Sequence, residues 1–133
     1  MVDTDISGYD TEKLPWSEDL HRLFWDFREA YPEEPYWVHF QPTDVHSPWR
    51  PIAPFSGLFA TIDERQVFKG MTEKINDVNK FDSWGDRVEK SGIDKDLYFH
   101  IARKLYDEAM CHQDHTIGQL VERALDFGQV LPA

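Results

Sequence analysis

Apolar residues recur at three- and four-residue spacing in the first part of the chain, a pattern that predicts an amphipathic helix. Ser17 precedes two acidic residues, so we predict it as the N-cap of this helix. The helix should end near Tyr31, because Pro32 and Pro35 disfavour its continuation. Its apolar face consists of Leu20, Leu23, Phe24 and Phe27.

The same spacing returns twice later in the chain. It predicts a helix over residues 62–80 and a long final helix over residues 96–127, capped by Asp94 or Asp96. Between these two helices, residues 81–92 are polar and show no continuous helical pattern, and Trp84 is expected to anchor this stretch. The residues predicted to be buried are Val67, Met71, Ile75 and Val78 in the first of these helices, and Ile101, Leu105, Ala109, Ile117, Leu120, Val121 and Ala124 in the second.

One stretch predicts a β-strand. Residues Tyr36–Gln41 are aromatic and β-branched, with prolines on both sides, and their almost continuous apolar character suits a strand covered on both faces. Residues 43–54 read as an ordered loop. A lone strand leaves its backbone donors and acceptors unpaired. We therefore predict an α/β fold in which this chain supplies one clear strand and about three helices, the other strands lying elsewhere.

Composition and charge indicate a folded chain and exclude several classes of partner and site. The chain has 133 residues, 41% of them hydrophobic and 14% aromatic, which is enough for a folded core. Its 14 basic and 25 acidic residues leave a net charge of −11, which argues against nucleic acid and anionic membranes as partners. The single cysteine, Cys111, excludes an internal disulfide and a thiolate cluster. We find no signal peptide and no run that could span a bilayer, so the compartment stays unknown.

The segment Pro35–Trp49, which reads PYWVHFQPTDVHSPW, resembles the central segment of the sulfatase family, a branch of the alkaline-phosphatase-like superfamily. A second stretch resembles another landmark of that family, a helix followed by an aspartate, an isoleucine–glycine pair and leucines. It comprises Leu105–Ala109 with Asp114, Ile117, Gly118, Leu120 and Leu125. The resemblance covers roughly residues 15–133 and implies part of an α/β/α sandwich, preceded by an acidic, mobile lead-in at residues 1–14.

The resemblance also implies an activity. A complete family enzyme is a sulfuric ester hydrolase that cleaves a sulfate-ester small molecule or a sulfated glycan through a formylglycine hydrate, assisted by a divalent cation, usually calcium. This chain has no Cys/Ser-x-Pro/Ala-x-Arg motif, no early aspartate pair and no Asp-His-Gly motif. We therefore predict no metal ligand within it, no cofactor bound by it alone, and no activity of the isolated chain.

His46 is the one family site residue that can be carried over. The resemblance implies that it lies beside the sulfate and helps either to bind it or to pass a proton to the leaving alcohol. Asp44 could orient the ring of His46, and Arg50 could reach an anionic substrate. The alternatives are a loop histidine bonded to Asp44 or to a backbone carbonyl, a turn residue at Asp44 and a salt bridge at Arg50.

The histidines, the cysteine and the tryptophans are three further sets of residues that could form sites. His112 and His115 lie three residues apart near Asp107, Glu108 and Asp114, so they could hold zinc, or they could be solvated histidines. Cys111 is expected to pack as a small apolar residue. The five tryptophans have no regular spacing, which favours anchoring over a binding platform; they are Trp16, Trp25, Trp37, Trp49 and Trp84.

A second hypothesis needs no resemblance. The small size and the acidic charge suit an interaction protein of the immunity or inhibitor type that covers a basic partner.

Overall fold

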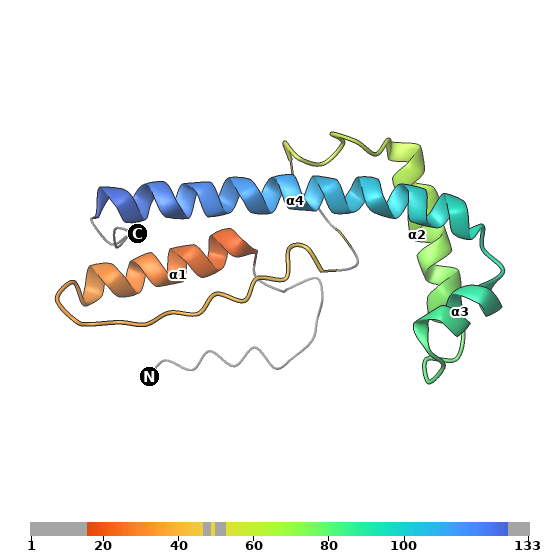
Figure 1. Ribbon diagram of the computed structural model, residues 1–133, viewed down its shortest axis with the longest axis horizontal. Helices are drawn as coiled ribbons and strands as arrows, with labels where there is room; N and C mark the ends of the chain where they lie inside the picture. The colour runs from red at the N-terminus through yellow and green to blue at the C-terminus, as the bar shows by residue number, and fades with distance from the viewer. Residues whose placement is uncertain (1–15, 47–48, 50–52, 128–133) are drawn as a thin grey trace. The chain divides into compact units, whose positions relative to one another are not determined.

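The computed structural model describes residues 16–46, 49 and 53–127, and it contains four helices there. The chain divides into two units (Figure 1). Unit 1 contains the residues up to His46 together with those from Gln113 onward, and unit 2 contains Ser47–His112. The predicted lead-in at residues 1–14 lies outside the described residues.

Unit 1 begins with helix α1, Ser17–Ala30. Trp16, and not Ser17, occupies the N-cap position, and the Asp19 carboxylate accepts the Trp16 backbone N–H at 3.1 Å. The helix ends at Tyr31, as the following prolines predict.

The chain then returns alongside α1 as an extended segment over residues 35–43, which we call the strap (Figure 1). The predicted strand Tyr36–Gln41 lies within it, but no described residue belongs to a β-strand. The prediction of an α/β sandwich with one clear strand, of the alkaline-phosphatase type, is therefore wrong: the fold is all-helical over the described residues. The physical reason is that the aromatic side chains of the strap pack on α1 instead of in a sheet. The ring of Phe24 lies 5.5 Å from Tyr36 and 5.4 Å from Phe40.

Unit 2 contains α2, Ile62–Asp77, and α3, Trp84–Ser91. The Thr61 hydroxyl and the Glu64 carboxylate form a reciprocal cap at the start of α2, which explains why this helix begins where the pattern predicts. Helix α3 lies in the stretch that was predicted to be broken. The Ser83 hydroxyl caps it, and left-handed Gly92 ends it.

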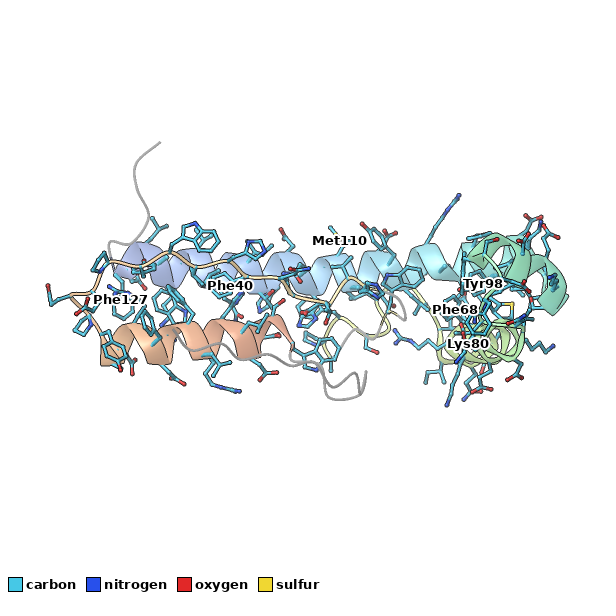
Figure 2. All side chains as sticks on the ribbon, turned by 90° about the horizontal axis from the view of Figure 1, so that it is seen from below. Phe40, Phe68, Lys80, Tyr98, Met110 and Phe127 are labelled. Carbon is cyan, nitrogen blue, oxygen red and sulfur yellow. The ribbon has the colours of Figure 1, made fainter. Side chains whose placement is uncertain are left out.

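The core of unit 2 forms around α2 and the first half of α4. Phe68 stacks on Tyr98 with ring centroids 4.8 Å apart (Figure 2). Val67 was predicted to be buried, but its neighbour Phe68 takes that place and Val67 is exposed. Trp84 is also half-exposed and does not act as a core anchor. The buried apolar cluster consists of Ala60, Phe68, Met71, Ile75, Val88, Tyr98, Ile101, Ala102 and Leu105.

Helix α4, Lys95–Asp126, is the predicted long helix, and the Asp94 carboxylate accepts the Leu97 N–H at its start. Its residues up to His112 belong to unit 2 and the rest to unit 1. The predicted buried stripe holds in the first half of the helix, through Ala109. In the second half Leu120 and Ala124 are partly buried, whereas Ile117 and Val121 are exposed, so the prediction is wrong for these two residues. The rest of unit 1 covers only part of the apolar face of α4.

Candidate interaction surface

His46 is exposed and lies at the end of a turn that its backbone N–H closes on the Thr43 carbonyl at 2.9 Å. It was predicted to follow a sheet strand, at the edge where α/β proteins bind ligands. It follows the strap instead, so no sheet edge forms a pocket around it within the described residues. Its sulfate-binding and catalytic role stays a prediction.

Asp44 is buried, and its carboxylate lies at the N-terminus of α1. The Ser17 backbone N–H donates to Oδ1 at 3.0 Å and to Oδ2 at 3.2 Å. The Ser17 hydroxyl donates to Oε1 of Gln113 at 3.0 Å, which joins the start of α1 to α4 within unit 1. A carboxylate at a helix N-terminus satisfies an unpaired donor and interacts favourably with the helix dipole. These contacts give Asp44 a structural role. It lies in a turn, as the alternative interpretation expected, but its contact with the N-terminus of α1 was not predicted.

The two histidines of α4, His112 and His115, differ in burial. His112 is buried in unit 2 and its ring stacks on Phe55 at 5.3 Å, whereas His115 is exposed in unit 1. Cys111 is partly buried, and Arg50 lies outside the described residues. Zinc binding by the two histidines therefore stays a prediction.

The role of Glu108, a buried carboxylate on α4, was not predicted from the sequence. It is fully buried in unit 2, where Oε1 accepts the backbone N–H groups of Gly57, Phe59 and Ala60 at 3.1, 2.9 and 2.8 Å. Its Oε2 is paired with the guanidinium of Arg65. Both oxygens are thus engaged, which makes Glu108 an anchor for the loop before α2. Its position seven residues after Ile101 places it on the buried face of α4, and that spacing could have revealed it.

The excess of acidic over basic residues lies mainly in unit 1. Its described residues include ten acids and only three bases, whereas those of unit 2 include eleven acids and nine bases. The described acids of unit 1 are Glu18, Asp19, Asp26, Glu29, Glu33, Glu34, Asp44, Asp114, Glu122 and Asp126.

The three bases among the described residues of unit 1 already have partners. Arg22 pairs with Asp19 at 2.8 Å. The guanidinium of Arg28 lies 4.4 Å from the ring centroid of Tyr36, and that of Arg123 lies 4.6 Å from that of Trp25. Within the part of the chain that the structure describes, six acids of unit 1 have no ion-pair partner: Asp26, Glu33, Glu34, Asp114, Glu122 and Asp126.

Apolar side chains remain exposed beside these acids. They recur at four-residue spacing, and so along one side of each helix of unit 1. They are Leu23 and Phe27 on α1, continued by its C-cap Tyr31, and Ile117, Val121 and Leu125 on α4. The strap adds Trp37, whose side chain is 85% exposed and stacks on His39 with centroids 6.1 Å apart. Exposed apolar groups of this kind mark interaction sites.

One histidine of unit 1 has a perturbed pKa. Burial lowers the pKa of His21 below its usual 6.5, while the nearby carboxylates of Glu18 and Asp44 raise it by less. The ring also meets Phe40 of the strap edge-on, at 5.1 Å. His21 therefore lies neutral between α1 and the strap at physiological pH, and it supports the packing of the strap.

No described helix is long and apolar enough to cross a membrane. A scan against protein-family models and searches of curated proteins and of solved structures found no match to this chain.

Proposed function

We propose that this chain is an acidic interaction protein that binds a basic partner through unit 1. The observation that carries the proposal is the charge of the described residues of unit 1: ten acids stand against three bases, and contacts within the unit already hold these three bases. A cationic partner would supply the missing counter-charges.

The exposed apolar residues support the same proposal. Charge complementarity steers association and selects the partner, but apolar contact supplies much of the affinity of a protein interface. Unit 1 offers both, because its unpaired carboxylates Asp114 and Glu122 lie on the same helix as Ile117 and Val121. An acidic patch without such apolar groups would suit simple solvation better.

Sulfate-ester hydrolysis, with its calcium ion and formylglycine, stays a prediction of the family resemblance alone. The sheet that should hold its site residues is missing from the described residues.

Four synthetic peptides test the proposal. Two are cationic, one an amphipathic Lys/Leu helix and one an alternating Lys/Val sequence, and two are their glutamate counterparts with the same apolar residues. Binding to the full chain is measured by fluorescence anisotropy. We expect at least one cationic peptide to bind, and its affinity to fall by about tenfold between about 50 and about 300 mM salt, because salt screens exposed charges.

The glutamate peptides should not bind, because like charges repel. Replacing Glu122 and Asp126 by lysine should lower the affinity for the cationic peptide. The same replacement at Asp77 and Asp86 of unit 2 should change this affinity little. Equal affinity for the cationic and acidic peptides, or no binding of either cationic peptide, would show that the proposal is wrong.

A further inference from the structure

The strap has side chains typical of a β-strand and runs as an extended segment (Figure 1), but no strand pairs with it among the described residues. The backbone N–H and C=O groups of five consecutive residues, Trp37–Gln41, make no hydrogen bond in the described structure. Aromatic and β-branched residues such as these are favoured in strands. Unpaired backbone groups in an extended segment form an edge to which another strand can add.

The side chains of the strap alternate as they do in a strand. Tyr36 and Phe40 turn toward α1, where both meet Phe24. Trp37 and His39 turn away and stack on each other with their rings 15° from parallel. The inward side chains, among them Phe40 (Figure 2), thus hold the strap against α1, and the outward pair is exposed.

We propose that Trp37–Gln41 is the edge to which an extended, basic segment of the partner adds as a β-strand. This inference rests on the proposed function and names how the partner is recognised. The backbone hydrogen bonds supply affinity that does not depend on sequence, and the side chains select the segment.

The surroundings of the strap favour a basic occupant. Glu33 and Glu34, exposed and without ion-pair partners among the described residues, come just before the strap. The exposed face of Trp37 can also receive a lysine or arginine cation. A second copy of the chain is disfavoured as the occupant, because each copy carries a net charge of −11.

The first test compares the alternating Lys/Val peptide with two versions that are N-methylated at alternate residues, one at the odd and one at the even positions. Methylation removes backbone donors and keeps the charges and side chains. Because alternate N–H groups of a strand point to opposite edges, we expect one version to lose at least about tenfold in affinity and the other to bind nearly as well as the parent. The Lys/Leu helix should bind more weakly than the parent.

The second test changes the strap itself. Proline removes an N–H but tolerates an extended backbone, so Val38→Pro and His39→Pro each delete a donor on opposite edges. One of the two proline variants should lower the affinity for the Lys/Val peptide at least about tenfold. Val38→Thr and His39→Thr keep the N–H and should leave this affinity unchanged. Far-UV circular dichroism confirms that each variant keeps its helices.

Hydrogen exchange of the strap amides gives a readout that needs no variant. They should exchange fast in the free chain, and those on one edge should become protected when the Lys/Val peptide binds. Protection in the free chain, whether or not it depends on concentration, would overturn the inference, because a second copy or another part of this chain would then occupy the edge.

If both N-methylated versions and the helix bind like the parent, strand addition is wrong while the proposed function stands. If no cationic peptide binds, both fail.

Discussion

The carboxylate of Asp44 holds the first N–H of helix α1, that of Ser17, with its two oxygens at 3.0 and 3.2 Å. The two residues stand 27 positions apart, so this contact joins the end of the strap to the beginning of the helix along which it runs. A helix N-terminus without such an acceptor leaves a buried donor unsatisfied. The position of the strap and the stability of α1 are therefore linked.

Replacing Asp44 tests this link. We expect Asp44→Ala to lower the free energy of unfolding by about 1–2 kcal/mol, the usual cost of losing a helix cap. Asp44→Asn keeps an acceptor and should cost less. Urea denaturation followed by circular dichroism measures both, with the exposed neighbour Thr43→Ala as control. A loss for Thr43→Ala as large as for Asp44→Ala would contradict the capping role.

Glu108 should be the most sensitive acid of unit 2. Glu108→Ala removes the acceptor for three backbone N–H groups and leaves Arg65 without its partner, so we expect a loss of about 3–5 kcal/mol in the free energy of unfolding. Asp107→Ala makes the same charge change at an exposed site next to it, and it should cost less than about 0.5 kcal/mol. Chemical denaturation of the two variants side by side decides the matter; similar losses would show that Glu108 is not an anchor.

Gly118 offers a stabilising change. It lies inside α4, and a Cβ built there would meet nothing within 4 Å. We expect Gly118→Ala to raise the free energy of unfolding by about 0.5–1 kcal/mol, because alanine loses less backbone entropy in a helix. Gly92→Ala is the matched control: Gly92 has a φ of +68°, so alanine there should destabilise the protein. Thermal unfolding of both variants would show opposite shifts, and a destabilised Gly118→Ala would mean that something packs against this face.

The pH dependence of stability should report His21. Burial lowers its pKa in the folded state below the unfolded value of 6.5, so the unfolded chain takes up a proton more readily. The stability that depends on neutral His21 is complete above the unfolded pKa and is lost as the pH falls through the lower folded pKa. His21→Gln should flatten this decline, while His39→Gln at an exposed site should not. The measurement is urea unfolding at about pH 7.5 and about pH 5.5, together with an NMR titration of the ring. An unchanged slope in His21→Gln would rule out this origin.

The sequence alone was enough to place three of the helices. The spacing of apolar residues marked α1 and α4 to within a residue or two and placed α2, because local propensity, prolines and caps act over a few neighbouring residues. Helix α3 was missed because eight residues with a single buried side chain, Val88, carry little periodicity. The sequence also established the acidic charge, but not its concentration in unit 1, which depends on how distant segments come together.

Tertiary structure decided the rest. The strap contains the residues Tyr36–Gln41 that were predicted to form a strand, and its backbone is extended, as in a strand. An extended segment joins a sheet only if another strand pairs with its backbone N–H and C=O groups. Here its aromatic rings find Phe24 on α1 instead. In the same way, Asp44 and Glu108 look like any other acids in the sequence. Each became structural only when folding brought backbone N–H groups from distant residues within hydrogen-bond distance of its carboxylate.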